Sequence, residues 1–181
     1  MVHPNGVHHV AFCTRDMKAQ LEFYTEVVGL ELNGLFWMHG VEGAMHAFLK
    51  LNDNCCLSFV QTADADARQP VEGLTYPSWP GDAVAWGTLQ HIALNLDSED
   101  DLLAMRDRIR SHGHEISDPI PHGFCKSIYM RAPENLTLEF STMLRDLDAS
   151  ELDMEVVEHC GITPDELERM MDRETRDAAI V

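Results

Sequence analysis

The sequence predicts an α+β fold in which two tandem βαβββ modules form a curved mixed β-sheet cup, followed by a helical C-terminal tail. The first observation is an internal repeat: residues 9–59 match residues 91–140 when the chain is shifted by 81 or 82 positions. The second is that each copy combines one helical stripe of apolar residues with runs that alternate as strands do. Each copy must bury its apolar face, and the nearest partner for that face is the other copy.

The first module covers residues 7–61 and is expected to carry one helix after its first strand. Asp16 is a suitable N-cap for that helix, and Gly29 is suited to end it. Turn-forming residues separate the strands that follow. The expected elements are a strand over 8–14, a helix over 17–28, and strands over 31–39, 45–51 and 55–61.

The second module covers residues 89–142 and repeats the same order of elements. Its helix is expected to begin at Ser98, which three acidic residues follow, and to end before Gly113. The expected elements are a strand over 89–96, a helix over 98–112, and strands over 115–117, 125–131 and 136–142.

Two segments lie outside the repeat. Residues 62–88 form a long connection rich in Pro, Gly and Asp that contains Tyr76, Trp79 and Trp86. A connection of this length is often functional, although a plain linker packed by its own aromatic residues is an equally open reading. The acidic tail, residues 143–181, is expected to form helices over 150–160 and 163–179, the second opening with a capping box at Thr163.

Composition narrows the class of protein. Thirteen basic and 31 acidic residues give a net charge of -18, which argues against nucleic acid or an anionic membrane as a partner. The five cysteines follow no CxxC spacing, and neither a signal peptide nor a long apolar run is present in the sequence. We therefore expect a cytoplasmic protein with a reduced interior.

The alternation of side chains along the strands brings three residues to one face. In the first strand Val10 and Phe12 belong to the core, so His9 lies on the opposite face. The same argument places His91 and Glu139 opposite the core residues of their own strands. If the two sheets join, these three side chains converge in the cup.

This set of three has the composition of a metal site. Two imidazoles and one carboxylate with open positions are typical of non-haem Fe(II), and the same ligands serve Mn(II), Ni(II), Co(II) or Zn(II). A lone histidine in a strand is more often a satisfied polar residue than a ligand. His9 and His91 occupy equivalent positions in the repeat, however, and Glu139 shares their face. The sequence therefore predicts a divalent metal held by these three residues, with Fe(II) favoured.

Several local motifs accompany the repeat. They are His9-Val-Ala-Phe12 and His91-Ile-Ala-Leu94 at the openings of the modules, Phe23-Tyr24 followed by Gly29-Leu30, and Leu136-Thr-Leu-Glu139-Phe140. In these features residues 7–142 resemble the vicinal oxygen chelate superfamily. That superfamily includes glyoxalase I, methylmalonyl-CoA epimerase, fosfomycin and bleomycin resistance proteins, and type I extradiol dioxygenases.

The resemblance implies a particular number of ligands. Members of the superfamily commonly take one ligand from the first strand and one from the last strand of each module, four in all. Here Ser58 stands where the equivalent of Glu139 would be. The resemblance therefore implies a three-ligand site of the dioxygenase type rather than a four-ligand glyoxalase-type site. Bleomycin-sequestering members usually lack the ligands, which weighs against a pure binding protein.

A second, narrower resemblance concerns the residues before Glu139. The series His122, Ile128-Tyr129, Ala132-Pro133 and Glu139 resembles the extradiol dioxygenase signature. It departs from that signature at Asn135, where Gly or Pro is usual. Those dioxygenases also carry an acid/base histidine upstream of the second ligand, and residues 62–90 contain none.

Three catalytic candidates follow from this resemblance. Tyr129 and His122 are expected to donate hydrogen bonds or protons to substrate oxygens, and His46, on the cup face by repeat register, is a candidate for the missing acid/base. Plainer readings remain open, because Tyr129 aligns with Phe48 and serves equally as a cup-lining aromatic residue. His122 stands in a Pro-His-Gly turn, where histidine is unremarkable.

The leading functional prediction is a metal-dependent, Fe(II) ring-cleaving dioxygenase of the extradiol type. Its substrate would be a catechol-like small molecule or another compound with adjacent oxygens. The alternatives are a glyoxalase-like or epimerase-like lyase or isomerase that uses a divalent metal without O2, and a non-catalytic, resistance-type binding protein. A homodimer is possible, because such modules pair either within a chain or between chains.

Overall fold

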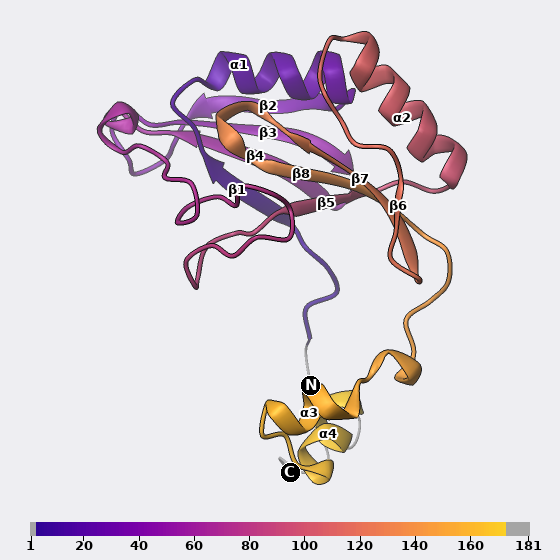
Figure 1. Ribbon diagram of the computed structural model, residues 1–181. Coiled ribbons are helices and arrows are strands. Elements are labelled where there is room, and N and C mark those ends of the chain that lie inside the picture. Colours follow the sequence, from indigo (N-terminus) through magenta and orange to yellow (C-terminus); the bar gives the residue numbers. More distant parts are fainter. Residues whose placement is uncertain (1–2, 173–181) are drawn as a thin grey trace. The chain divides into compact units, whose positions relative to one another are not determined.

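In the computed structural model, which describes residues 3–172, each half of the repeat folds into a four-stranded sheet with a helix beside it (Figure 1). Residues 5–144 form one compact unit that contains both modules. Residues 3–4 and 145–172 belong to a second unit. The α+β class and the two tandem modules are confirmed.

The first module has the strand order β1-β4-β3-β2, with β1 parallel to β4 and the other pairs antiparallel. Along β1 the exposure alternates, so that Val10 and Phe12 are less exposed than His9 and Ala11. The elements are β1 (His9–Cys13), α1 (Met17–Glu22), β2 (Glu31–Trp37), β3 (Met45–Asn52) and β4 (Cys55–Gln61).

The helix expected over 17–28 changes its type partway along. Asp16 caps its start, since its Oδ1 accepts a hydrogen bond from the backbone N–H of Ala19 at 3.0 Å. The segment Phe23–Val28 is a π-helix rather than an α-helix. Within it, the Thr25 hydroxyl donates to the Leu21 carbonyl at 2.7 Å and so competes with the regular backbone pairing.

The second module repeats this topology with the strand order β5-β8-β7-β6. Ser98 caps its helix by accepting from the N–H of Asp101 at 3.1 Å. The elements are β5 (Ile92–Asn95), α2 (Glu99–Ser111), β6 (Ile120–Pro121), β7 (Cys125–Arg131) and β8 (Thr137–Met143).

The strand expected over 115–117 was wrong, and the short β6 takes its place at the sheet edge. Ser117 does lie beside β7, where its N–H donates to the Tyr129 carbonyl at 3.0 Å. Its hydroxyl, rather than its carbonyl, accepts from the Tyr129 N–H at 2.9 Å. Pro119 then has no N–H to donate, so a regular ladder cannot continue through this segment.

The two modules share a core, although their strands form two hydrogen-bonded sheets rather than the single sheet that the sequence suggested. One cluster of buried apolar residues includes Tyr24 and Phe59 of the first module and Leu102 and Phe140 of the second. Arg108 of α2 also donates to the carbonyls of residues 26 and 27, both at 2.8 Å. These contacts place the end of the first module's helical segment against α2.

The segment over 62–88 is not packed by its own tryptophans, because Trp79 is 61% exposed and Trp86 is 97% exposed. It contains a short 3₁₀ turn, Ala65–Ala67. Arg131 at the end of β7 holds it by stacking over Tyr76 and by donating to the Ser78 carbonyl at 2.7 Å. The reading of this segment as a linker packed by its own aromatics is therefore wrong for both tryptophans.

The tail contains a 3₁₀ turn, Ala149–Glu151, and the helices α3 (Met154–His159) and α4 (Pro164–Met171). The capping box at Thr163 is confirmed, with hydrogen bonds in both directions to Glu166. The rest of the expected helix, 173–179, lies outside the described residues. Within residues 3–172 no helix has the length and apolarity needed to cross a membrane.

Candidate functional site

Glu139 lies in the middle of β8, where Ala93 of β5 is its partner on one side and Tyr129 of β7 on the other. In the first module Ser58 of β4 has Ala11 of β1 and Phe48 of β3 as its partners. Strand register therefore makes Ser58 the counterpart of Glu139 and Phe48 the counterpart of Tyr129.

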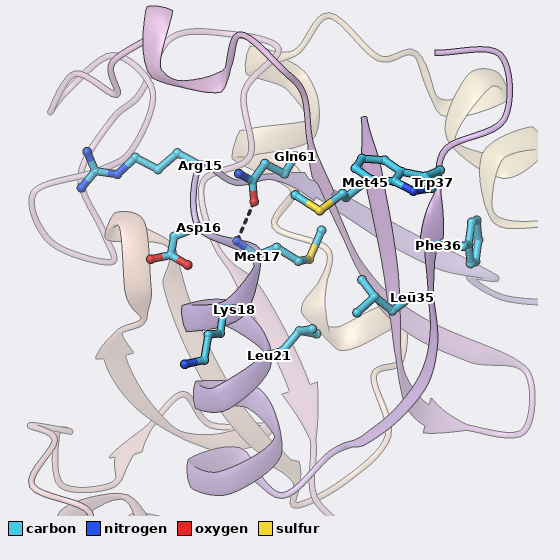
Figure 2. A pocket seen from close by; sticks show the side chains of 10 residues that line it. All are labelled: Arg15, Asp16, Met17, Lys18, Leu21, Leu35, Phe36, Trp37, Met45 and Gln61. Carbon is cyan, nitrogen blue, oxygen red and sulfur yellow. Dashed lines mark hydrogen bonds between the residues drawn. The ribbon is translucent and has the colours of Figure 1, made fainter. Parts of the chain in front are cut away.

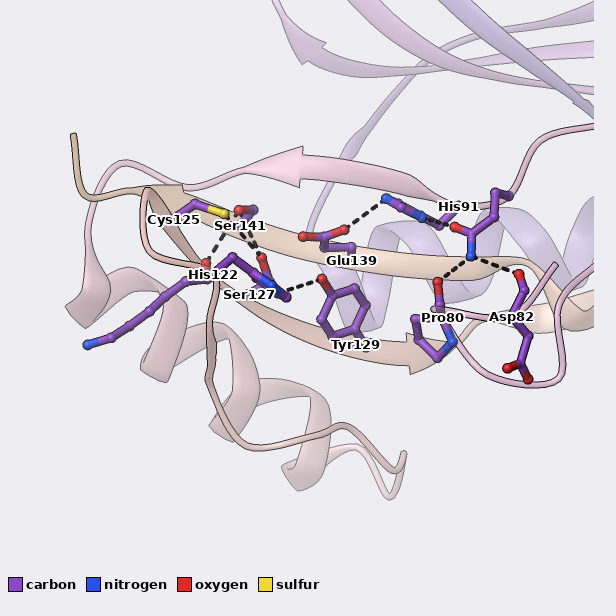
Figure 3. A network of polar contacts seen from close by, with 11 residues as sticks. Pro80, Asp82, His91, His122, Cys125, Ser127, Tyr129, Glu139 and Ser141 are labelled. Carbon is purple, nitrogen blue, oxygen red and sulfur yellow. Dashed lines mark hydrogen bonds and ion pairs between the residues drawn. The ribbon is translucent and has the colours of Figure 1, made fainter. Parts of the chain in front are cut away.

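Two of the three predicted metal ligands come together. His91 immediately precedes β5, and its Nε2 lies 3.1 Å from Oε2 of Glu139 (Figure 3). The Glu139 residue is only 6% exposed. A carboxylate is stable at such a depth only with strong polar partners, and the imidazole of His91 is one of them.

The other nitrogen of His91 contacts Gln90. Nδ1 of His91 faces the side-chain oxygen of Gln90, while the Gln90 amide nitrogen donates to the carbonyls of Pro80 and Asp82. Backbone carbonyls only accept hydrogen bonds, so the amide group can be oriented in one way only. Its oxygen then requires an N–H at Nδ1 of His91.

The hydrogen on Nδ1 of His91 bears on whether His91 and Glu139 suit a metal. With its hydrogen on Nδ1, a neutral His91 presents the Nε2 lone pair to the Glu139 carboxylate, and two acceptors face each other at 3.1 Å. The repulsion between the two acceptors is removed when a second proton binds to the pair, or when a divalent cation lies between them. An imidazole nitrogen and a carboxylate oxygen are good ligands for such a cation.

Tyr129 and His122 lie beside this pair. The Tyr129 hydroxyl is 2.9 Å from Nε2 of His122, and the two rings are perpendicular. Burial raises the pKa of the Tyr129 phenol to about 12, and the negative charge of Glu139 adds to the rise. The phenol therefore keeps its proton near neutral pH and is available as a hydrogen-bond donor.

His46 occupies the corresponding region of the first module. Its Nε2 lies 2.6 Å from the hydroxyl of Ser58, which is fully buried, and its ring packs 4.4 Å from that of Phe48. Burial lowers the pKa of the His46 imidazole, and the nearby His9 lowers it further. His46 is therefore favoured in its neutral form.

His9 does not join His91 and Glu139 in this structure. Its Nδ1 is 2.8 Å from Nδ1 of His8, and its ring contacts Phe48 edge-on. Across the described range, 3–172, no three His, Cys, Asp or Glu side chains gather closely enough to hold a metal ion. The predicted three-ligand set is thus assembled only as the pair of His91 and Glu139.

Sequence reasoning missed Gln90. Its position directly before a candidate ligand is the only signal in the sequence, because its partners Pro80 and Asp82 belong to a connection without a recognisable motif. A cavity of about 580 Å³ was also missed (Figure 2). It lies between the start of α1 and the strands β2 and β3, lined by Met17, Leu21 and Trp37 among others, and none of the predicted site residues borders it.

Comparisons with known proteins agree with this fold. The family model described as Glyoxalase/Bleomycin resistance protein/Dioxygenase superfamily matches residues 6–140. No curated protein sequence matches the chain. Among solved structures, a glyoxylase/bleomycin resistance protein/dioxygenase domain from Frankia sp. EAN1pec has a TM-score of 0.61 and 18% identity, covering 78% of this chain and 99% of that one.

Two further structures show the same fold. Lactoylglutathione lyase from Agrobacterium tumefaciens has a TM-score of 0.53 and 18% identity, over 77% of this chain and 94% of that one. A mutant of the fosfomycin resistance protein FosX from Listeria monocytogenes, complexed with Mn(II) and 1S,2S-dihydroxypropylphosphonic acid, has a TM-score of 0.50 and 17% identity, over 76% and 92%. With the family model covering most of its length, the chain belongs to the Glyoxalase/Bleomycin resistance protein/Dioxygenase superfamily.

Proposed function

We propose that this protein is a metal-dependent, extradiol-type dioxygenase that cleaves a catechol-like small molecule or another substrate with adjacent oxygens. The observation that carries the proposal is the hydrogen-bonded pair of Tyr129 and His122 beside Glu139, which in turn faces His91. In the proposed site a protonated phenol, an imidazole and a carboxylate would act on one small molecule. The role proposed for each group follows from its chemistry.

The proposed metal is divalent, with Fe(II) favoured. Nε2 of His91 and the carboxylate of Glu139 would hold it, and His9 is proposed as the third ligand, released from its contact with His8. Bound Fe(II) supplies Lewis acidity toward two adjacent substrate oxygens and one-electron chemistry toward O2. Two observations support this metal site. Imidazole nitrogen and carboxylate oxygen are suitable ligands, and the two acceptor atoms of His91 and Glu139 that face each other would be stabilised by a cation.

Tyr129 would orient the substrate by donating its phenolic hydrogen to one of the adjacent oxygens. A phenol keeps this hydrogen near neutral pH, and burial raises the pKa of Tyr129 further. His122, 2.9 Å away, would hold the phenol in position by donating from Nε2 to the phenolic oxygen, which leaves the phenolic hydrogen for the substrate. A hydrogen bond to an oxygen that gains negative charge strengthens as the charge develops, so this contact favours the transition state.

His46 is proposed as the acid/base group that residues 62–90 do not supply. Its pKa is lowered, so the neutral imidazole is able to accept a proton near neutral pH. Ser58 holds the ring at 2.6 Å and is itself buried. Because Ser58 is engaged with His46 and provides no carboxylate, a four-ligand glyoxalase-type site has less support than a three-ligand site.

The experiment that tests the proposal combines metal analysis with an oxygen electrode. The purified protein should bind about one Fe(II) per chain and consume O2 with catechols or related compounds, giving a ring-opened product. Turnover without O2, on Zn(II), Ni(II) or Co(II), would favour the lyase or isomerase instead. Stoichiometric ligand binding with neither product nor metal would favour a binding protein.

We further propose a cytoplasmic location, in which the five free cysteines remain reduced. A homodimer stays a prediction, and light scattering on the purified protein would test it.

A further inference from the structure

We propose that Gln90 is a positioning residue that fixes the tautomer of His91 and thereby makes the turn at residues 79–82 part of the metal site. This inference rests on the proposed function, since it concerns one of the proposed ligands. It also makes a statement about the metal-free protein that can be tested separately.

The first step is the orientation of the Gln90 amide. Its nitrogen donates to two backbone carbonyls, those of Pro80 and Asp82. Neither carbonyl can donate in return, so rotating the amide by half a turn would set oxygen against oxygen at both. The amide oxygen is therefore held toward His91.

The second step is the tautomer of His91. Two acceptors compete for the single hydrogen of a neutral His91: the Gln90 oxygen at Nδ1 and the Glu139 carboxylate at Nε2. The Gln90 oxygen, fixed by the two bonds of its amide nitrogen, holds that hydrogen on Nδ1, which leaves the Nε2 lone pair available to a metal. Partners of this kind orient ligating histidines in many metal sites, and their loss typically weakens metal binding by about 10- to 100-fold.

The third step is the rigidity of the turn that supplies the carbonyls. The N–H of Trp79 donates to the Asp82 carboxylate at 2.9 Å, and the N–H of Asp82 donates back to the Trp79 carbonyl at 2.9 Å. Arg131 attaches the neighbouring Ser78 to the end of β7 at 2.7 Å. The Pro80 and Asp82 carbonyls, which accept from Gln90, are thus held in place by the turn and by its attachment to β7. The connection between the modules therefore takes part in the proposed site.

The first module provides an internal comparison. The residue before each candidate histidine contacts the Nδ1 of that histidine: His8 contacts His9, and Gln90 contacts His91. A histidine nitrogen either donates or accepts, so His8 does not fix the tautomer of His9. An amide oxygen only accepts, so Gln90 fixes that of His91. The preceding residue therefore fixes the histidine tautomer in the second module and not in the first.

The test uses Gln90→Met, which keeps the length of the side chain and removes both sets of hydrogen bonds. Gln90→Glu keeps an acceptor for His91 and removes the donor to the turn. Gln69→Met is the matched control, because Gln69 in the same connection donates to the Asp66 carbonyl, away from His91. The tautomer is read from imidazole ¹⁵N shifts in the metal-free proteins, well above the ordinary histidine pKa of about 6.5, with the signal assigned by its loss in His91→Asn.

The wild type and the Gln69→Met control should show His91 with hydrogen on Nδ1. Gln90→Met should lose that preference and bind Mn(II), titrated by calorimetry, about 10- to 100-fold more weakly. Gln90→Glu should keep the tautomer while the fluorescence of Trp79 changes as the turn is released.

An unchanged His91 tautomer in Gln90→Met, or a wild-type His91 with hydrogen on Nε2, would overturn the inference. If Gln90→Met fails to fold, loss of the tautomer in Gln90→Glu would overturn it instead. Failure of the wild type to bind Mn(II) or Fe(II) would refute the proposed metal site, and the tautomer would still decide the role of Gln90.

Discussion

Ser58 and Glu139 occupy the same position in the two modules, each in the middle of the module's last strand and each within 3.1 Å of a histidine nitrogen. Ser58 contacts Nε2 of His46 at 2.6 Å, and Glu139 contacts Nε2 of His91 at 3.1 Å. The first pair joins a hydroxyl to an imidazole, and the second joins a carboxylate to an imidazole. The role proposed for the first pair is proton transfer, and the role proposed for the second is metal binding.

His46→Gln should therefore separate catalysis from metal binding. Loss of an acid/base group typically lowers turnover by about 10²- to 10⁴-fold, whereas Fe(II) affinity should change little because His46 is not a proposed ligand. Steady-state kinetics and metal titration on the same preparation measure both. Ser58→Ala, which removes only the partner of His46, should give a smaller loss. Full activity in His46→Gln would exclude the proposed role.

Tyr129→Phe should slow turnover by about 100-fold or more, since one positioned hydrogen-bond donor to a developing charge is worth that much. Its metal affinity should stay near that of the wild type. His122→Gln should show the same pattern to a lesser degree, because His122 acts on the substrate through Tyr129. If Tyr129→Phe lost metal affinity by as large a factor as it lost turnover, the phenol would be needed for the metal site rather than for the reaction.

The raised pKa of Tyr129 predicts a change of stability at alkaline pH. The folded protein holds the phenolic proton up to about pH 12, while an unfolded chain releases it near about pH 10. The folded state therefore loses stability as the pH rises from about 10 to about 12. Urea unfolding across this range should show a smaller decline in Tyr129→Phe than in the wild type, and an identical decline would contradict the assignment.

Tyr24→Phe should leave the stability unchanged or raise it. Tyr24 is fully buried, and among the described residues its hydroxyl is one of two buried side-chain atoms without a hydrogen-bond partner. Removing an unsatisfied buried hydroxyl recovers a desolvation cost of about 1–3 kcal/mol. Chemical denaturation measures the difference, and a marked loss of stability would indicate that the hydroxyl has a partner in solution.

Arg108→Met tests the attachment between the modules. Arg108 donates to the carbonyls of Glu26 and Val27, and hydrogen bonds from a charged donor typically contribute about 1.5–3 kcal/mol. The free energy of unfolding should fall by about that amount, and the proposed site residues should be unaffected. Arg106→Met is a suitable control, because Arg106 bonds to the exposed acids Asp107 and Asp118.

The repeat predicted the fold well because strand alternation and helix caps are local properties. The boundaries of β4 and β7 agree with those expected, and Asp16 and Ser98 cap the helices as predicted. The failures have local causes that the pattern of apolar residues does not record. Thr25 bonds back to Leu21 within the π-helical segment, and in the strand expected over 115–117 the Ser117 hydroxyl, rather than its carbonyl, accepts from the Tyr129 N–H.

The site was predictable only in part. Alternation places His91 and Glu139 on one face, and the structure brings them together. Alternation does not specify side-chain rotamers, and His9 turns to His8 and Phe48 instead. Nor does it anticipate contacts with an irregular connection, which is why Gln90 was missed.

His91 and Glu139 are proposed to hold a divalent metal, and Fe(II) titration under anaerobic conditions tests this in the wild type, His91→Ala and Glu139→Gln. The wild type should show about one site per chain, and both variants should lose it while remaining folded by circular dichroism. Undiminished Fe(II) binding in either variant, or none in the wild type, would contradict the proposal.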